Sequence, residues 1–309
     1  MSILISGSLA YDYIMDFPDS FKNHILPDQI HILNVCFVVD NLKKNYGGVA
    51  GNIAYTMKLL GVEPIIFSPL GTDGKDYLNY LKKNNLSVDY IKLAKEKLTP
   101  SAHIITDKDD NQITAFYNGA LSDAVELSIK NVKEKIELAL ISPTQKEAMI
   151  KHAKECYEQK IPFCFDPGQQ ITALSDQEII KIISQAKFLI GNDYEIKLIQ
   201  EKTDWKMEDL LNCVEAVIIT LGDRGSMVVT KKETIEVGIC PADSVDDPTG
   251  AGDAYRAGFF SAYVQGLDWR TCAQMGAVAA TYAIEKYGTQ NHQFTKEEFS
   301  QRYRETFGE

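Results

Sequence analysis

The sequence has few of the features that hold a small secreted domain together or anchor a chain in a membrane. Its 309 residues include six cysteines, which form no Cys-x-x-Cys pair and no dense framework. We therefore expect reduced, mostly buried thiols, as in a cytosolic protein. No apolar run approaches membrane-spanning length, and the N-terminus shows no basic region followed by a long apolar core. These absences predict a cytoplasmic protein with no signal peptide and no membrane partner.

Positive charge is also scarce, because 32 Lys and Arg residues stand against 43 Asp and Glu residues, giving a formal net charge of −11. Surfaces that bind nucleic acid favour basic patches, so we expect no nucleic-acid partner. A nucleotide substrate stays compatible with this charge, since a local group of amides can bind phosphate. Hydrophobic content of 45% and charged content of 24% are ordinary for a soluble globular protein. The length suffices for a large α/β core.

The most informative stretch is Asp247–Asp253, which reads Asp-Pro-Thr-Gly-Ala-Gly-Asp and leads into a predicted helix. Its small residues Gly250, Ala251 and Gly252 let the backbone approach a ligand. Their amides would lie at the helix N-terminus, where unpaired N–H groups and the helix dipole favour an anion. Asp253 is a carboxylate that can take a proton from a hydroxyl nucleophile. An anion hole beside a base meets the needs of phosphoryl transfer to an alcohol, although a capped Gly-rich loop is the plainer alternative.

This stretch resembles the C-terminal signature of the ribokinase-like (PfkB) carbohydrate and nucleoside kinases. A second signature of that family, Gly-Gly before a small-residue helix, is similar to Gly47–Asn52, about 200 residues earlier. The resemblance covers essentially the whole chain. It implies one α/β domain over 1–309, with a doubly wound, mostly parallel sheet and helices on both faces. It also implies a small β-sheet lid formed by about 11–46 and 98–118.

Local patterns agree with such a fold. Buried strand-like runs are predicted at 2–9, 63–70, 161–165, 188–192 and 216–222, and helices at 48–60, 76–84, 252–266, 268–286 and 295–305. This alternation favours a parallel sheet with helices on both faces. Further β-rich pieces, at 11–17, 31–46, 101–106 and 112–117, predict a small separate sheet with a turn at 107–111, and a hairpin is predicted over 227–237. An ordinary edge hairpin is the alternative to a lid.

The resemblance implies a sugar-binding role for residues near the N-terminus. Asp12 would hold the vicinal hydroxyls of a sugar, chemistry that suits a carboxylate with two acceptor oxygens. Ser8 and Gly48 belong to the stretches that carry the resemblance, and Asn52 would donate to a substrate hydroxyl. The plainer alternatives are an Asp in a turn and an Asn on the solvent face of a helix.

Four stretches resemble the bacterial type of adenosine kinase more closely than ribokinase or the phosphofructokinases; they are 7–12, 116–120, 166–170 and 253–259. Many sugar-specific relatives carry Asp-x-Asn-x-Arg where this chain has Asp-Pro-Gly-Gln-Gln. The amides of Gln169 and Gln170 could bind the edge of a purine through paired donors and acceptors. Phe116 matches the lid aromatic that stacks on adenine, with His103 expected at the opposing lid position. A core position is the alternative for Phe116.

The segment Asn192–Glu195 matches the Asn-x-x-Glu motif of the family, in which the Glu orders Mg²⁺ and phosphate, often through water. Asn192 as N-cap with Glu195 at the third helical position also fits a simple helix cap, and both interpretations can hold. The resemblance also implies that Asn192 binds ATP, and it places the ATP phosphates and ribose near Thr220, Gly222 and Gly225.

The family also includes kinases that bind a monovalent cation such as K⁺. The resemblance puts this ion near the carbonyls of 247–249 and the region around Gly288. The sequence permits such a site without identifying it.

Together these features predict an adenosine kinase, an enzyme that transfers the γ-phosphoryl group of Mg-ATP in line to the 5′-hydroxyl of adenosine, giving AMP as in purine salvage. Asp253 would be the general base and Gly250–Gly252 the anion hole. A ribokinase-like sugar kinase or a broad-specificity nucleoside kinase shares these catalytic residues. A nucleotide-binding sensor without chemistry is the non-enzyme alternative. Exposed apolar strands of the lid could form a homodimer contact.

Overall fold

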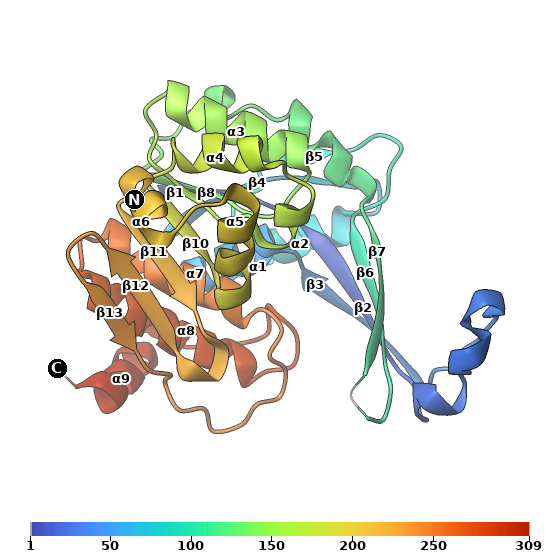
Figure 1. Cartoon of the computed structure of the whole chain (residues 1–309). Coiled ribbons are helices and arrows are strands. Elements are labelled where there is room, and N and C mark those ends of the chain that lie inside the picture. The colour runs from blue at the N-terminus through green and yellow to red at the C-terminus, as the bar shows by residue number, and fades with distance from the viewer. Residues whose placement is uncertain (1, 110, 309) are drawn as a thin grey trace.

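The computed structural model describes residues 2–109 and 111–308 (Figure 1). Nine strands form its main sheet: β1 (Ser2–Ser6), β4 (Glu63–Leu70), β5 (Ile91–Leu93), β8 (Leu138–Ile141), β9 (Phe163–Phe165), β10 (Phe188–Asn192), β11 (Ala216–Thr220), β12 (Ser226–Thr230) and β13 (Thr234–Val237). Their order across the sheet is β13-β12-β11-β10-β9-β8-β1-β4-β5. Strands from β5 to β11 pair in parallel, whereas β12 and β13 pair antiparallel. The carboxyl ends of the parallel strands therefore meet along one edge.

Helices cover both faces of this sheet. One face carries α3 (Lys146–Glu158), α4 (Asp176–Ile183), α5 (Asp193–Thr203) and α6 (Met207–Cys213), and the other carries α1 (Val49–Leu59), α2 (Lys75–Lys83), α7 (Ala251–Val264) and α8 (Trp269–Ile284). The last helix, α9 (Lys296–Phe307), packs against α8. Along β1, Ile3 and Ile5 join one apolar core and Leu4 joins the other, because neighbouring strand residues point to opposite faces. The predicted doubly wound, mostly parallel sheet is confirmed.

A second, four-stranded sheet stands off the side of this core (Figure 1). It consists of β2 (Ala10–Asp16), β3 (Asn41–Gly47), β6 (Ser101–Thr106) and β7 (Gln112–Tyr117), in the order β3-β2-β6-β7. We call this sheet the lid. Its strands lie within one residue of the two segments for which the sequence predicts a lid.

The prediction of β structure from residue 31 is wrong for the first part of that segment, because β3 begins only at Asn41. Residues 17–40, which we call the arm, contain two short 3₁₀ helices, η1 (Phe21–Asn23) and η2 (Pro27–Ile32), and project from the far end of the lid (blue in Figure 1). The ring of Phe37 lies 4.9 Å from that of Phe17 and 5.0 Å from that of Phe21. Among the apolar residues that suggested a strand, Phe37 thus packs on aromatic rings within the arm, whereas Ile32, Leu33 and Val38 are exposed.

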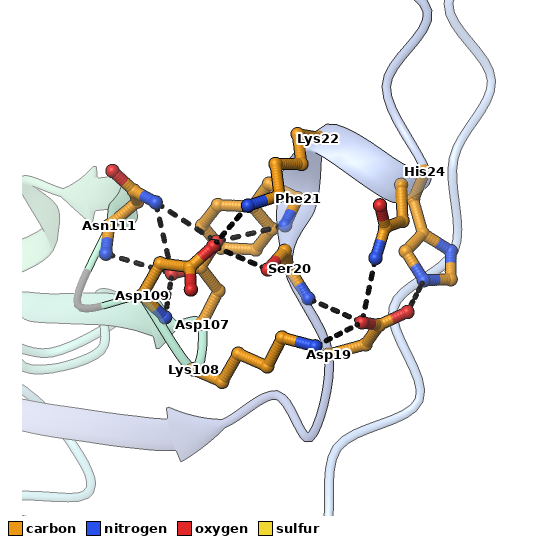
Figure 2. A network of polar contacts seen from close by, with 10 residues as sticks. Asp19, Ser20, Phe21, Lys22, His24, Asp107, Lys108, Asp109 and Asn111 are labelled. Atoms are coloured by element: carbon orange, nitrogen blue, oxygen red, sulfur yellow. Dashed lines mark hydrogen bonds and ion pairs between the residues drawn. The ribbon is translucent and has the colours of Figure 1, made fainter.

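A polar network fastens the arm to the turn between β6 and β7 (Figure 2). The carboxylate of Asp107, only 4% exposed, accepts hydrogen bonds from the backbone N–H of Phe21 at 2.8 Å and of Asn111 at 2.9 Å. The predicted turn at 107–111 is thus present, and Asp110 within it lies outside the described residues. These contacts tie the arm to the lid on the side away from the core.

All six cysteines are free. Four are buried, Cys213 is partly exposed and Cys36 on the arm is exposed, which confirms the prediction of reduced, mostly buried thiols. Of the helices in the described part of the chain, none has the length and apolar character needed to span a bilayer.

Candidate active site

A cavity of about 520 Å³ lies where the lid faces the carboxyl ends of the central strands. It brings together most of the predicted site residues, namely Ser8, Asp12, Gly48, Asn52, Phe116, Gln169, Gln170, Glu195, Gly250 and Asp253. They come from the end of β1, from lid strands β2 and β7, from the loop after β9, and from the N-terminal turns of α1, α5 and α7. Ligands of open α/β sheets gather at this edge.

The N-terminus of α7 leaves backbone amides free beside the cavity. Its N-cap, Gly250, has a φ of 82°, and a Cβ added there would lie 2.9 Å from Cγ2 of Thr289, so the position favours glycine twice over. Among the described contacts, the N–H groups of Gly250 and Gly252 reach no acceptor. The N–H of Ala251 is directed to the carbonyl of Pro248 at 3.3 Å, and its predicted role in the anion hole stays a prediction. The remaining open amides lie at the positive end of the helix dipole.

Asp253 lies on the first turn of α7 and faces the cavity. Asn52 Nδ2 donates to its Oδ2 at 2.8 Å. Burial raises the pKa of the Asp253 carboxyl to about 6, while the nearby Arg256 guanidinium and the Asn52 hydrogen bond act in the opposite direction. The group is therefore mostly ionised at neutral pH, yet more basic than an ordinary Asp. Such a pKa suits a general base.

Asp12 shares the cavity with Asp253. Burial raises its pKa to about 6, with further contributions from the charges of Asp253 and Asp247. The Gly-Gly signature makes room for it: a Cβ added at Gly47 would overlap Oδ2 of Asp12, and one at Gly48 would lie 2.6 Å from the backbone of β2. Two interacting carboxyls in one cavity titrate as a pair.

Phe116 lines the cavity with its ring 52% exposed, opposite Ala102 in the lid register and near Ile104. His103 points to the reverse face of the lid, where it stacks on Tyr13 with 4.9 Å between ring centroids. Adjacent strand residues face opposite sides, so His103 does not oppose Phe116, and that prediction is wrong. The cavity face of the lid around Phe116 is aliphatic.

Other predicted ligands show how the chain already uses them. Ser8 Oγ accepts a hydrogen bond from the N–H of Val49 at 3.2 Å and so caps α1. The Asn52 amide holds Asp253, in addition to any substrate contact predicted for it. Gln169 is exposed and Gln170 half-buried in the 3₁₀ helix η5 (Gly168–Thr172). Within the described chain, the side-chain amides of both glutamines have no hydrogen-bond partner, which leaves them available to a ligand.

The four residues predicted to bind ATP lie outside this cavity. Asn192 ends β10 beside Thr220, which ends β11, and Gly222 and Gly225 bound the short 3₁₀ helix after β11. Asn192 Oδ1 accepts from the N–H of Glu195 and Glu195 Oε2 accepts from the N–H of Asn192, both at 2.8 Å. The predicted helix cap is present, and the role in ATP binding stays a prediction.

The donor set fits a magnesium ion that arrives with a nucleotide. Glu195 lines the cavity, and in the described chain its Oε1 has no hydrogen-bond partner. Residues 2–109 and 111–308 contain no cluster of three or more His, Cys, Asp or Glu side chains that could hold a metal. Few protein ligands are typical of Mg²⁺ bound mainly by phosphates. The segments predicted for a monovalent cation adjoin each other, since the N–H of Gly288 donates to Asp247 Oδ2 at 3.0 Å.

Comparison with known proteins identifies the family. The sequence pattern of the pfkB family carbohydrate kinases matches residues 25–296. The chain belongs to this family. This pfkB-family chain is 36% identical to the nucleoside kinase of Methanocaldococcus jannaschii over 288 residues, which are 93% of this chain and 91% of that protein.

Solved structures agree with the assignment. The Burkholderia thailandensis nucleoside kinase in complex with inosine is similar with a TM-score of 0.91 and 33% identity, covering 100% of this chain and 99% of that one. The same kinase in complex with ADP-inosine gives 0.88 and 35%, covering 100% and 97%. The predicted family and fold are confirmed.

Sequence reasoning assigned no role to one ion pair in the site of this pfkB-family chain. Arg256, one turn beyond Asp253, donates from Nε to Asp166 Oδ2 at 2.7 Å and from Nη2 to Asp166 Oδ1 at 2.6 Å. The side chains are only 10% and 2% exposed, and Arg256 also donates to the carbonyl of Gly252 at 3.0 Å. The pair anchors α7 to the end of β9 and places a cation on the cavity wall. The spacing of Asp253 and Arg256 on one helix face was the available signal, but no sequence pattern pairs Arg256 with Asp166.

Proposed function

We propose that this protein is an ATP-dependent nucleoside kinase that phosphorylates the 5′-hydroxyl of adenosine. One observation carries the proposal: Asp253, the open amides of α7, Asp12 and the lid aromatic Phe116 share one cavity. The first three meet the needs of phosphoryl transfer to a sugar hydroxyl. The fourth offers a flat apolar face to a base. The similar kinases from M. jannaschii and B. thailandensis are both named nucleoside kinases.

The nucleoside would lie between the lid and the sheet edge. The Asp12 carboxylate accepts hydrogen bonds from the two vicinal ribose hydroxyls. The ring of Phe116 stacks on the base, with aliphatic Ile14 and Ile104 beside it. The free amides of Gln169 and Gln170 approach the base edge. This arrangement directs the 5′-hydroxyl toward Asp253.

Transfer then follows an in-line displacement. As the 5′-oxygen forms its bond to the γ-phosphorus, Asp253 accepts the hydroxyl proton and the bond from the γ-phosphorus to the β–γ bridging oxygen breaks, releasing ADP. The amides of Gly250 and Gly252, with the Arg256 guanidinium, stabilise negative charge on the transferring group. Glu195 would help to hold a Mg²⁺ ion that arrives with ATP, and this ion would supply charge screening on the phosphates.

A broad-specificity nucleoside kinase is the second candidate. The cavity face of the lid around the ring offers aliphatic side chains, Ile14, Ala102 and Ile104. Aliphatic contacts stabilise any flat base and do not distinguish an amino from an oxo substituent on it. A sugar kinase, by contrast, would leave Phe116 without a role, and a sensor would need no base at Asp253.

The test is an ADP-release assay with Mg-ATP and a panel of acceptors: adenosine, inosine, cytidine, ribose and fructose 6-phosphate. Preferential turnover of adenosine supports the proposal as stated. Comparable rates with adenosine, inosine and cytidine would establish the broad-specificity alternative. Turnover of ribose alone would keep Asp253 and overturn the base-binding role of Phe116. No turnover with any acceptor would contradict the proposed function.

A further inference from the structure

A buried chain of hydrogen bonds connects Asp253 to the end of lid strand β3. Tyr77, from α2, donates from its hydroxyl to the carbonyl oxygen of Gly47 at 2.6 Å. Gln290 Nε2 donates to that hydroxyl at 2.7 Å and to Asn52 Oδ1 at 3.0 Å. Asn52 Nδ2 in turn donates to Asp253 Oδ2 at 2.8 Å. Three side chains, those of Tyr77, Gln290 and Asn52, thus join the base to the lid.

These bonds lie in the interior. Tyr77 is 0%, Gln290 3% and Asn52 6% exposed. Water does not compete for buried donors and acceptors as it does at a surface, so a hydrogen bond between them orients its partners more strictly.

The direction of every bond is fixed by donor and acceptor chemistry. A backbone carbonyl only accepts, so the single hydroxyl proton of Tyr77 is directed to Gly47. The tyrosine oxygen can then only accept, which requires the NH₂ group of Gln290 to face it. The same NH₂ group faces Asn52, which must therefore present its oxygen. Turning the oxygen of Asn52 toward Gln290 turns its own NH₂ group toward Asp253.

Thr289 makes a second connection between the lid and Asn52. Thr289 is only 4% exposed. Its hydroxyl oxygen lies 2.8 Å from Asn52 Oδ1 and 3.1 Å from the carbonyl oxygen of Tyr46 on β3. A threonine hydroxyl has one proton and both neighbours are acceptors. The proton can serve Asn52 or the lid strand, so the placement of β3 decides how firmly Asn52 is held.

We propose that Tyr77, Gln290 and Thr289 are positioning residues that hold the Asn52 amide against Asp253 and make the orientation of the base depend on the position of lid strand β3. This inference rests on the proposed function, because it assigns Asp253 the role of base. With Oδ2 occupied by Asn52, Oδ1 of Asp253 is left for the 5′-hydroxyl. The base is then correctly oriented only while β3 is in place.

The buried hydrogen-bond chain of Tyr77, Gln290 and Asn52, which we call the relay, also affects the ionisation of Asp253. A hydrogen bond from Asn52 favours the charged carboxylate and lowers the pKa of Asp253. The charged groups that face Asp253 from neighbouring elements are Arg256 of its own helix, Asp166 after β9, Glu195 of α5 and Asp12 of the lid. Because disrupting the relay leaves all of these in place, a change in the pH profile reports on Asn52.

The experiment compares Tyr77→Phe and Gln290→Met with the matched control Tyr80→Phe. Tyr80 donates to the backbone carbonyl of Gln290 at 2.7 Å and so loses a bond to the same residue without touching the relay. We expect the two relay variants to lower kcat about tenfold, the effect of one hydrogen bond to a charged group. We expect KM for the nucleoside within about twofold of the wild type and the acid limb of the pH–rate profile at higher pH.

Tyr80→Phe should leave kcat and the acid limb unchanged, and Thr289→Ser should retain the activity that Thr289→Val loses. Relay variants with an unshifted acid limb, or an equal shift in the control, would overturn the relay while leaving the proposed function intact. If the wild type turned over no acceptor, the proposed function would fail separately. The relay would then be tested by measuring melting temperature across pH for the wild type and for Asp253→Asn, each with and without Tyr77→Phe. The quantity compared is the difference in melting temperature that Asp253→Asn causes. If Tyr77→Phe left the pH dependence of this difference unchanged, the result would contradict the relay.

Discussion

Two carboxyl groups dominate the chemistry of the cavity at the scale of single residues. Asp12 and Asp253 both have a pKa raised to about 6, in each case mainly by burial. Near neutral pH both are largely ionised, so the folded protein holds two like charges in a partly dry space. The arrangement suits proton transfer and opposes stability.

Replacing the base should separate chemistry from binding. We expect Asp253→Asn to lower kcat by about 10² to 10⁴-fold, because proton removal from the 5′-hydroxyl is lost. Adenosine affinity should change little, since Asp12 and Phe116 stay in place. ADP release and calorimetric titration measure the two quantities. Asp204→Asn, at an exposed position at the end of α5, is the matched control; near-normal turnover of the Asp253 variant would refute the base assignment.

The rate should depend on pH through the same group. Asp253 accepts a proton only when ionised, and its pKa is raised to about 6. We therefore expect kcat/KM to fall as the pH drops through about 6, with a limb that reports the coupled pair rather than one residue. Rates measured across that range test this, and an acid limb near the ordinary Asp value would contradict the raised pKa.

The contribution of Asp253 to folding stability should fall with rising pH, whereas the rate should rise. The folded-state pKa of Asp253, about 6, lies above the ordinary value of 3.8 for an Asp side chain, so its contribution favours folding at low pH and is lost as the pH rises through about 6. Asp253→Asn keeps the shape without the charge. We expect this variant to melt at a higher temperature than the wild type near pH 8 and at the same temperature near the ordinary pKa of Asp. A lower melting temperature near pH 8 would show that the ionised carboxylate is net stabilising.

At the scale of elements, alternation along the lid strands determines which side chains can meet a ligand. Phe116 faces the cavity and His103 faces away. We expect Phe116→Ala to raise KM for the nucleoside about tenfold through lost stacking, with little change in KM for ATP. His103→Ala should leave both constants near those of the wild type. Steady-state kinetics test the pair, and a larger effect from His103 would reverse the assignment.

Local sequence patterns were sufficient to predict those strands and helices whose own residues show the spacing typical of the element. The run Phe188–Asn192 forms β10 over the predicted span, and β12 and β13 form the hairpin predicted over 227–237. The same reasoning was wrong for the arm, where Phe37 packs on Phe17 and Phe21 outside any strand and Ile32 and Val38 stay exposed. An apolar run with strand-like spacing does not by itself show that a strand partner covers it.

The site was predictable where one short motif supplies several groups and unpredictable where groups meet across the chain. Asp253 and its neighbouring amides follow from one stretch. The pair of Arg256 and Asp166 joins α7 to the end of β9, and the bonds of Gln290 join the C-terminal region to α2. No spacing rule connects such residues. The face to which His103 points likewise depends on strand register, which only the assembled lid shows.

At the scale of the whole molecule, the reverse face of the lid carries exposed apolar side chains. Leu42 is 64%, Ile113 40% and Tyr117 45% exposed, and the arm adds Val38 at 75%. Monomeric proteins rarely leave large apolar patches uncovered. We propose that a second copy of the chain covers this surface in a symmetric homodimer, in which the same patch serves both partners.

Light scattering after size-exclusion chromatography tests the dimer. We expect the wild type to elute as a dimer and the double variant Leu42→Lys, Ile113→Lys to elute as a folded monomer. The introduced lysines would place like positive charges on both partners where apolar side chains now meet. Leu267→Lys, at a residue 41% exposed on the core, is the control and should stay dimeric. A wild type that stays monomeric at high concentration would exclude this contact.

The residues predicted for ATP lie along the sheet edge outside the space beneath the lid, and this has a consequence for product release. With ATP bound at the ends of β10 and β11, as predicted, ADP would dissociate without passing beneath the lid, whereas the phosphorylated nucleoside would have to leave from under it. Release would then be ordered, with ADP first.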